Sequence, residues 1–461
     1  MLRRKMSDIL MKWKSDHRND CLLVMGARQV GKTFIIDDFA RKNYKNYVYM
    51  NFEIDPGLKS VFDGSLEVDN LITEISGRVR NAALEPGKTL IFLDEIQSCP
   101  QARTSLKSFA LDGRFDVIAS GSLLGLNRKK ISSYPVGYET PLWMHSLDFE
   151  EFLWALGVGD RAIEKVKRNI GAKEPLSGSM LDAMNEYFRW HMLVGGMPQA
   201  VNAFIGSRDL GRVSAVQKKI VENYSGDISK YAPNNLQARA RACLRSVPAQ
   251  LNKRNKRFML SQVDADEPRY TGALEDSIDW LYEAGIIDYC RNLCEPTLPL
   301  MANARTGIYK IYMRDTGLLI SMMEDGVADA ILNKDLTINQ GAVMENIIAE
   351  IMIKKRTDLF YFEKRGSLEV DFITNIEGTA AAIEVKSGNN NRSKSLDSVM
   401  SERYNVKRGM KFENSNIFVD EKGIEHYPQF AAAFVLPDHS EFGRAARTVE
   451  IARPDPAWEA D

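Results

Sequence analysis

The sequence predicts a multidomain α/β protein that begins with a parallel β-sheet. Through residues 1–155, short apolar runs alternate with segments of helical spacing, which is the order that a parallel sheet with covering helices requires. Beyond them, changes of hydrophobic period and Pro/Gly clusters mark further boundaries. The 461 residues therefore divide into the sheet domain at 1–155, a helical segment at 156–225, a helix-and-hairpin segment at 226–330, and a second α/β domain with its tail at 331–461.

The first strand and the loop after it carry the clearest chemical pattern. Cys21 to Met25 is an apolar run typical of a buried strand, and Phe34 to Lys42 has helical spacing. Between them stands GARQVGKT, a pattern in which backbone N–H groups approach phosphate oxygens, Lys32 reaches the β- and γ-phosphates and Thr33 holds Mg²⁺. The following helix N-terminus adds unpaired N–H groups. The predicted nucleotide-binding residues of the loop are Gly26, Ala27, Arg28, Gln29, Val30, Gly31, Lys32 and Thr33.

Two later strands complete this predicted site and argue against a chance glycine turn. Leu90 to Leu93 is a buried parallel strand that ends in Asp94 and Glu95 at the ligand edge of the sheet. Asp94 is predicted to hold Mg²⁺ through water, and Glu95 to polarise the water that attacks the γ-phosphate. The strand from 115 to 119 ends in Ser120-Gly121-Ser122, where the Ser120 hydroxyl could sense the γ-phosphate. The alternative is that these serines are turn residues.

The composition predicts a cytoplasmic protein. With 61 basic and 62 acidic side chains the net charge is −1, so any nucleic-acid surface must be a local patch. Of the five cysteines only Cys290 and Cys294 are close together, which favours reduced thiols over disulfides or a zinc site. The N-terminus lacks the apolar core of a signal peptide, and no apolar run approaches the ~20 residues that cross a bilayer.

The middle of the chain is predicted to be helical before a strand pair appears. Residues Val194 to Pro198 separate two helices within the segment 156–225. Farther on, Thr271 is an acceptable N-cap for a helix that runs to Gly285, and an apolar strand follows it. Helices followed by a strand pair are typical of a winged helix. The basic run from Lys253 to Arg257 lies just upstream and could meet DNA phosphates, with a solvated charge run as the alternative.

The last segment contains a hairpin with charged residues on one face. The runs 368–373 and 380–386 are predicted to pair, with Leu368, Val370 and Phe372 sharing a face. Strand parity then places Asp371 on the same face as Glu384 and Lys386.

These hairpin residues suit metal-assisted hydrolysis of phosphodiesters. Asp371 and Glu384 are predicted to bind Mg²⁺, and Lys386 to steady the anion or the nucleophile, so that Glu384 and Lys386 are candidate catalytic residues. Glu345 is a further candidate metal ligand, because it lies on an upstream helix among small apolar neighbours and should point inward. The alternatives are a surface hairpin with ordinary exposed charges and a site that keeps its geometry after losing its chemistry.

Together these motifs resemble a known family. GARQVGKT, LIFLDEIQ, Ser120-Gly121-Ser122, LDFEEF at 147–152, GGMP at 195–198 and the terminal EVDF and IEVKSG are similar to those of prokaryotic AAA-type ATPases that carry a C-terminal domain of uncharacterised function. That family resembles the archaeal-ATPase branch of P-loop NTPases. The resemblance extends from about residue 20 to about 420.

The resemblance implies a P-loop ATPase core, a helical lid, a winged helix and a terminal domain similar to the PD-(D/E)xK, restriction-endonuclease-like nucleases. One departure affects assembly. Many relatives have a Gly-Arg pair where this chain has Tyr134-Pro135-Val136-Gly137-Tyr138, so an arginine supplied to a neighbour's nucleotide would have to be another residue, with Arg128 as the substitute.

The sequence therefore predicts an enzyme that binds ATP and Mg²⁺ and uses Lys32 and Glu95 in catalysis. Its nucleotide state would reposition the winged helix and the nuclease-like domain on DNA, in a monomer or an oligomer. The alternative is a nucleotide-controlled switch that binds a protein partner and carries an inactive nuclease-like domain. The near-zero net charge favours the switch, whereas the set Asp371, Glu384 and Lys386 favours the enzyme.

Overall fold

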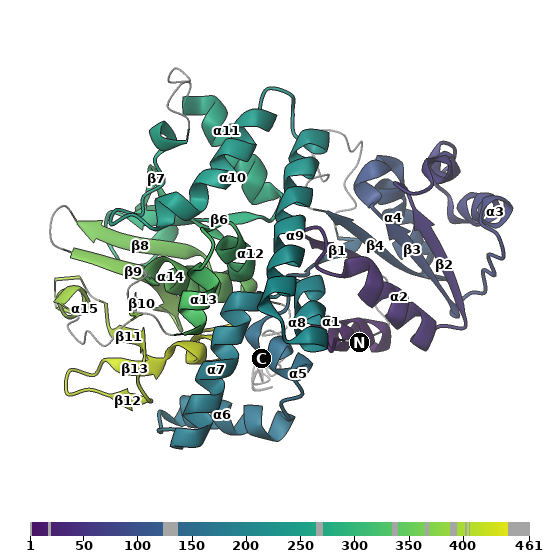
Figure 1. Ribbon diagram of the computed structural model, residues 1–461. Coiled ribbons are helices and arrows are strands. Elements are labelled where there is room, and N and C mark those ends of the chain that lie inside the picture. The colour runs from purple at the N-terminus through teal and green to yellow at the C-terminus, as the bar shows by residue number, and fades with distance from the viewer. Residues whose placement is uncertain are drawn as a thin grey trace, which may run out of the picture.

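Two β-sheets lie at opposite ends of the chain's computed structural model, with long helices between them (Figure 1). The structure describes residues 2–16, 20–122, 137–263, 271–333, 340–364, 368–387, 394–401, 403–404 and 406–440. Arg128 and residues 134–136, which bear on the predicted inter-subunit arginine, lie outside these ranges.

The N-terminal sheet has five parallel strands in the order β2-β3-β4-β1-β5, as predicted for an α/β core. Strand β4 lies between β1 and β3, so the ends of all three meet at one edge of the sheet. The strands are β1 (Cys21–Gly26), β2 (Asn46–Asn51), β3 (Thr89–Asp94), β4 (Asp116–Ser122) and β5 (Glu139–Trp143).

Both faces of this sheet are buried, which explains why its strands are continuously apolar. Successive side chains of β1 alternate between the faces: Leu22 and Val24 join one hydrophobic cluster, and Leu23 and Met25 join the other. Two helices cover the first face and two the second. They are α1 (Lys5–Ser15) and α2 (Lys32–Asn43) on one side, and α3 (Val68–Arg78) and α4 (Pro100–Asp112) on the other.

A group of helices follows the first sheet, as predicted. The α7–α8 junction falls at the predicted break, since α7 ends at Val194 and Pro198 occupies the first turn of α8. The helix α9 is the longest of the described helices, and it runs between the two sheets (Figure 1). The helices of this region are α5 (Phe149–Ala155), α6 (Asp160–Ala172), α7 (Gly178–Val194), α8 (Pro198–Ser207), α9 (Leu210–Tyr231), α10 (Gln237–Leu251) and α11 (Thr271–Glu283).

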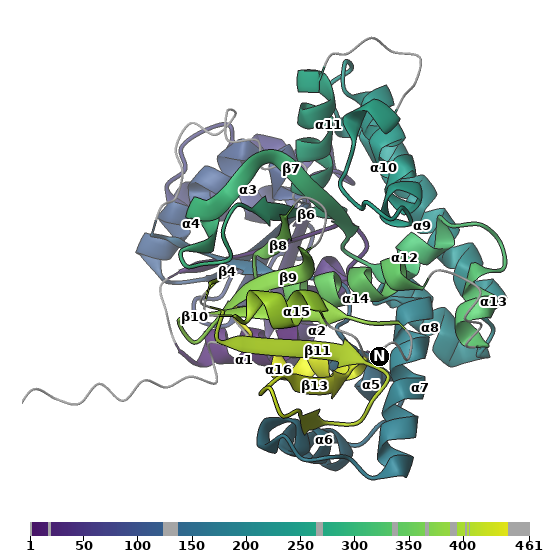
Figure 2. The same ribbon diagram turned by 90° about the vertical axis from the view of Figure 1, so that its left-hand side faces the viewer.

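The second sheet has eight strands of mixed direction in the order β12-β13-β11-β10-β9-β8-β6-β7 (Figure 2). Helix α14 packs on one face and α15 on the other. The elements of this unit are β6 (Ile287–Leu293), β7 (Ala304–Met313), α12 (Thr316–Ser321), α13 (Val327–Leu332), α14 (Gly341–Lys354), β8 (Leu359–Lys364), β9 (Leu368–Ile376), β10 (Thr379–Val385), α15 (Lys394–Val399), β11 (Arg408–Glu413), β12 (Phe418–Val419), β13 (Glu425–Pro428) and α16 (Ala432–Val435).

This topology places part of the predicted segment 226–330 in the same sheet as the segment 331–461. The hairpin of β6 and β7, assigned from the sequence to a separate winged helix, belongs to the second sheet, because β6 pairs in parallel with β8. A division at residue 330 would cut hydrogen-bonded strands apart. The sequence pattern showed a strand pair but could not show what lies beside it.

The predicted common face of Leu368, Val370 and Phe372 is also wrong. The register of β9 against β8 shifts between the partners of Phe360 and Phe362, which is a β-bulge. As a result Leu368 and Val370 pack in the cluster beneath α15, whereas Phe372 packs in the cluster beneath α14. One extra residue reverses the side-chain alternation on which strand parity depends.

No helix in the described part of the chain combines the length and apolar character needed to span a membrane. All five cysteines are unpaired, and only Cys294 is exposed.

Candidate functional site

The glycine-rich loop connects the buried end of β1 directly to the first turn of α2. Gly31 is the N-cap of α2 with φ of 98°, a left-handed conformation that glycine adopts without strain. Gly26 has no room for a side chain, since a Cβ there would overlap the carbonyl oxygen of Met144. The loop backbone is thus held against the strand end, and Gly31, Lys32 and Thr33 at the N-terminus of α2 line the cavity.

Asp94 is the most fully hydrogen-bonded side chain of the site, and it is 1 % exposed. Its Oδ2 accepts hydrogen bonds from Thr33 Oγ1 at 3.0 Å, Tyr49 OH at 2.9 Å and Asn51 Nδ2 at 2.9 Å. Its Oδ1 accepts one from the Ser120 hydroxyl. The strand order explains this meeting, because β2 and β4 flank β3. The hydroxyl and the carboxylate predicted to hold Mg²⁺ therefore lie together.

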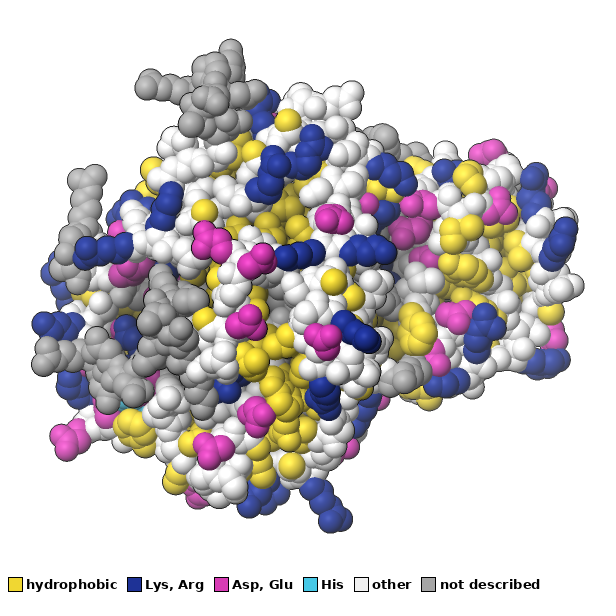
Figure 3. All heavy atoms as spheres, viewed as in Figure 1, with side chains coloured by type: hydrophobic (Ala, Val, Ile, Leu, Met, Phe, Trp, Pro, Cys, Tyr) yellow, Lys and Arg dark blue, Asp and Glu magenta, His cyan; other side chains and the backbone are white. Residues whose placement is uncertain are grey.

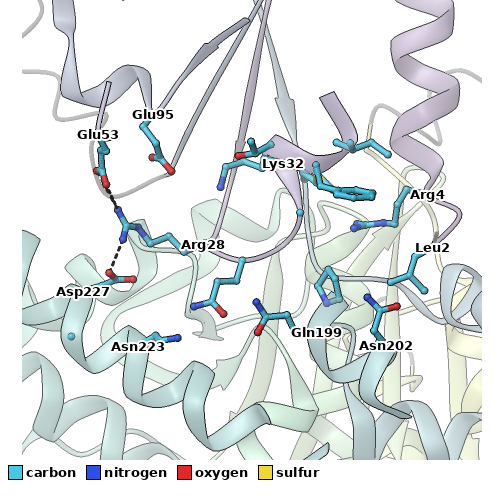
Figure 4. A pocket seen from close by; sticks show the side chains of 18 of the residues that line it. Leu2, Arg4, Arg28, Lys32, Glu53, Glu95, Gln199, Asn202, Asn223 and Asp227 are labelled. Carbon is cyan, nitrogen blue, oxygen red and sulfur yellow. Dashed lines mark hydrogen bonds and ion pairs between the residues drawn. The ribbon is translucent and has the colours of Figure 1, made fainter. Parts of the chain in front are cut away.

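Glu95 follows Asp94 with φ of 54°, an unusual backbone conformation for a residue without a glycine's freedom. Burial raises the pKa of its carboxyl, and the Gln97 amide, which donates a hydrogen bond to it, opposes that rise. Strained residues of this kind concentrate at functional sites. Glu95 lines the cavity and faces Lys32 across it (Figure 4).

Lys32 lies at the floor of the same cavity and is 7 % exposed. Its Nζ donates to the carbonyl oxygens of Gly26 at 3.0 Å and Ala27 at 2.9 Å. Burial lowers its pKa to about 8, although the charges of Glu95 and Asp94 oppose that change. The ammonium group is held by two neutral carbonyls, which leaves its charge available to an anion.

The cavity has a volume of about 960 Å³, and α9 supplies one of its walls. Arg28 connects the loop to that wall: it donates hydrogen bonds to Asp227 at 2.8 Å and to the Tyr231 hydroxyl at 2.7 Å. A cavity of this size suits a nucleotide-sized ligand. The residues that α9 contributes to the wall are Glu222, Asn223, Gly226, Asp227 and Lys230.

Sequence reasoning missed Tyr49, Asn51 and the α9 residues of this wall. A signal existed for Asn51, since it ends a strand of the parallel sheet, where ligand-binding residues collect. The α9 residues gave no signal, because an amphipathic helix does not show in its sequence which cavity it will border.

Comparison with known proteins agrees with this geometry. Residues 18–153 match the family profile described as an AAA domain. Residues 18–153 are an AAA-type P-loop domain. Two further profiles, both of domains of unknown function (DUF8612 and DUF4143), match residues 185–329 and 340–432. No curated protein matches the chain significantly.

Solved structures similar to the chain are distant. The Walker-type ATPase PABY2304 of Pyrococcus abyssi is 15 % identical, with 70 % of this chain and 96 % of that one covered and a TM-score of 0.44. The Orc1 protein of Aeropyrum pernix in complex with DNA is 10 % identical, with 72 % and 91 % covered and a TM-score of 0.27. At such TM-scores these similarities add nothing to the assignment of the AAA domain.

The four predicted residues of the terminal site lie near one another: Glu345 is on α14, Asp371 and Glu384 are on β9 and β10, and Lys386 directly follows β10. Lys386 Nζ is 2.5 Å from Glu384 Oε1, and the charges of Glu384, Asp371 and Glu345 all raise the pKa of Lys386 against the effect of its burial. Asp371 lies at the bulge, and its Oδ2 accepts the backbone N–H of Val385 at 2.8 Å.

Two lysines and a tyrosine hydroxyl contact the carboxylate of Glu345. Its carboxylate is ion-paired with Lys256, lies 3.6 Å from Lys310 Nζ and accepts a hydrogen bond from the Tyr312 hydroxyl at 3.0 Å. Burial opposes ionisation of Glu345, but the two lysines lower its pKa. Burial, together with the charge of Glu345, raises the pKa of Asp371 to about 7. We call the set Lys256, Lys310, Glu345, Asp371, Glu384 and Lys386 the terminal cluster.

The described residues contain no group of three or more His, Cys, Asp or Glu side chains arranged to hold a metal ion. The metal-binding roles of Glu345, Asp371 and Glu384 stay predictions. A metal ion would have to compete with the lysines of the terminal cluster for those carboxylates.

The basic run 253–257 is largely bonded within the protein. Lys253 donates to Gln262 at 2.6 Å, Lys256 pairs with Glu345, and Arg257 donates to Glu363 at 3.0 Å. This segment therefore ties the end of α10 to the second sheet, a role that neither of the two sequence interpretations included.

Proposed function

We propose that the protein is a Mg²⁺-dependent ATPase whose nucleotide state is transmitted to the unit built on the eight-stranded sheet. The observation that carries this proposal is the 3.0 Å hydrogen bond between Thr33 Oγ1 and Asp94 Oδ2, with Lys32 and Glu95 lining the same cavity. An oxygen pair of one hydroxyl and one carboxylate suits Mg²⁺, which keeps several waters and takes its remaining ligands from phosphates.

Each side chain has a role in the proposed reaction. Lys32 would bind the β- and γ-phosphates, and Thr33 and Asp94 would hold the metal. Bound Mg²⁺ would neutralise the charge that develops on the phosphates. Glu95 accepts the proton of the attacking water, and its raised pKa places it closer to the working pH than an ordinary carboxylate. Ser120, bonded to Asp94, couples the end of β4 to the same centre.

An ATPase assay with nucleotide-binding measurements tests this proposal. Lys32→Ala should lose nucleotide binding, whereas Glu95→Gln should bind MgATP and lose turnover. The matched control is Lys42→Ala, since Lys42 lies on the same helix in an exposed i,i+4 pair with Asp38. Turnover by Glu95→Gln at the normal rate would remove Glu95 from the role of base.

The path from the nucleotide to the second sheet follows α9. The C-terminal half of α9 borders the cavity between Glu222 and Lys230, and α9 also packs on α12, which in turn packs on α14. Gln217 of α9 also donates to the carbonyls of Leu193 and Val194 at the end of α7, at 2.8 and 2.9 Å. We infer that the helices α6 to α9 act as the lid of the AAA domain and move as nucleotide binds.

DNA and a protein partner remain the two proposed targets of this movement, and two observations favour the protein partner. Three of the basic side chains at 253–257 are used within the protein, and basic and acidic groups are interspersed over the face shown in Figure 3. DNA binding would release counterions and weaken steeply with salt. ATPase rates with and without single- and double-stranded DNA, over a range of salt concentration, decide between the two targets.

The proposed terminal metal site has its own test, which is independent of the ATPase. Mn²⁺ should raise the melting temperature of the Lys32→Ala protein if the carboxylates of the terminal cluster bind it, because a ligand stabilises the state it binds. Asp371→Asn in the same background should abolish the rise. A melting temperature indifferent to Mn²⁺ in both proteins favours an inactive terminal domain and the switch function.

A further inference from the structure

Arg28 is the one cation of the glycine-rich loop besides Lys32, and three groups hold its guanidinium. The Nη atoms donate to Asp227 at 2.8 Å, to the Tyr231 hydroxyl at 2.7 Å and to Glu53 at 3.3 Å. The guanidinium carbon lies 4.5 Å from the centroid of the Tyr231 ring, within the range of a cation–π contact. The side chain is therefore fixed against the α9 wall of the cavity while remaining 21 % exposed.

Arg28 lies at the same end of the cavity as Glu95 (Figure 4). Figure 4 shows Arg28, Glu53, Asp227 and Glu95 at one end of the cavity, with Lys32 between them and the end that holds Leu2, Gln199 and Asn202. Burial opposes ionisation of Arg28, but the charges of Asp227, Tyr231, Glu53 and Glu95 raise its pKa. If Glu95 activates water, the last phosphate of the nucleotide must lie at this end, within reach of Arg28.

Arg28 also has bonding capacity that its present partners do not use. Its Nε is buried and has no hydrogen-bond partner among the described residues. A guanidinium presents five N–H donors in a planar fork that matches a phosphate group. A buried N–H donor without an acceptor lowers the stability of the free protein. A phosphate oxygen that accepted this hydrogen bond would therefore bind more tightly.

We propose that Arg28 binds the γ-phosphate of the nucleotide held by its own chain. This inference rests on the proposed function and deepens it, since Arg28 would supply from within the site the cation that other enzymes of this type take from a neighbour. The phosphate competes with Asp227 for the guanidinium. Binding of ATP, but not of ADP, would therefore weaken the link between the loop and α9.

The difference between ATP and ADP separates this role from a structural one. Affinities for MgATP and MgADP are measured by titration calorimetry in the Glu95→Gln background, where turnover is blocked. Arg28→Ala should weaken MgATP binding at least about tenfold, as expected for a lost charge-assisted contact, and should change MgADP binding little. Arg41→Ala is the matched control, since Arg41 lies on α2 in an exposed i,i+4 pair with Asp37.

A second variant guards against a failure to fold. Asp227→Asn removes the competing carboxylate charge, so it should increase the preference for MgATP over MgADP severalfold, a gain that misfolding cannot produce. An equal loss of both nucleotides in Arg28→Ala, or an unchanged preference in both variants, overturns the role of Arg28. Absence of nucleotide binding by the protein with Arg28 and Lys32 intact would instead contradict the proposed function itself.

Discussion

Burial lowers the pKa of Lys32 and raises that of Glu95, so the proposed reaction should depend on pH at both ends of the neutral range. Lys32 must be charged to bind phosphate, and this charge is lost as pH rises through about 8. Glu95 must be ionised to accept a proton, and it becomes so only above its raised pKa. The profile of kcat/KM, which reports the free enzyme, should be bell-shaped with an alkaline limb near pH 8.

The profile of kcat provides the internal control. Bound phosphates stabilise the charged form of Lys32, so the alkaline limb of kcat should lie at higher pH than that of kcat/KM. An alkaline limb of kcat/KM at the ordinary lysine value of 10.5 would show that Lys32 is not desolvated in the free protein.

Tyr49→Phe should lower the stability of the AAA domain by about 1 to 2 kcal/mol, because it removes one hydrogen-bond donor from the buried Asp94 carboxylate. Tyr47→Phe is the matched control two residues earlier on β2, since the Tyr47 hydroxyl has no hydrogen-bond partner among the described residues. Urea unfolding of the two variants compares them directly. Equal effects would mean that the bond from Tyr49 to Asp94 contributes nothing net.

At the residue scale, local pattern predicted some members of the site and could not predict others. Four site residues could be predicted because each lies at the end of a strand or the start of a helix whose hydrophobic period is visible in the sequence. They are Lys32, Thr33, Asp94 and Glu95. Tyr49 and Asp227 were not, because their place in the site depends on β2 lying beside β3 and on α9 docking over the loop. These are tertiary contacts between segments that lie far apart in the sequence, so no short stretch of sequence predicts them.

The junction of α7 and α8 is joined to the rest of the protein through Gly196. Its carbonyl accepts the Leu147 N–H at 2.7 Å, and its N–H donates to Asp315 at 2.9 Å. A Cβ at Gly196 would overlap backbone atoms of Leu147. Gly196→Ala should therefore destabilise the protein by about 3 kcal/mol, the upper part of the range for overpacking.

Gly206→Ala is the control for this junction, because Gly206 lies within α8 with open space where a Cβ would stand. It should stabilise α8 by up to about 1 kcal/mol through its higher helix propensity. Thermal melts of both variants test the contrast. A loss of stability in Gly206→Ala as large as in Gly196→Ala would mean that contact with Leu147 is not the cause.

At the scale of elements, the sequence predicted the two strands of the hairpin, β9 and β10, and the upstream helix that carries Glu345. The turn lies at Glu377 and Gly378, both with positive φ. The bulge was not predictable, because Leu368 to Phe372 alternates as regularly as an unbroken strand would. The extra residue shows only in the pairing with β8.

Across the whole molecule, one cluster of buried apolar residues extends from α1 and α2, through α7 and α9, to α14 and the second sheet. The β6–β7 hairpin was assigned to a separate unit for this reason: changes of hydrophobic period mark elements, whereas the sequence does not show which elements share a core or a sheet. The segment 252–258 connects α10 to the unit of the second sheet, because its Lys256 forms an ion pair with Glu345 on α14.

A double-mutant cycle on this ion pair tests how tightly the two parts are joined. Lys256→Met leaves the buried Glu345 with only Lys310 and Tyr312, and should cost about 3 kcal/mol, as breaking a buried ion pair does. Glu345→Gln should cost a similar amount, because it leaves Lys256 without its anion and Lys310 with only Glu369.

The double variant should cost less than the sum of the two, by about 1 to 3 kcal/mol, since residues in contact do not act independently. Lys422→Ala, at an exposed pair with Asp397, should leave unfolding in urea unchanged. Additive costs would mean that Lys256 does not neutralise Glu345. The carboxylates of the terminal cluster would then have only Lys310 and Lys386 as resident cations, and a divalent metal would again be a better candidate to balance them.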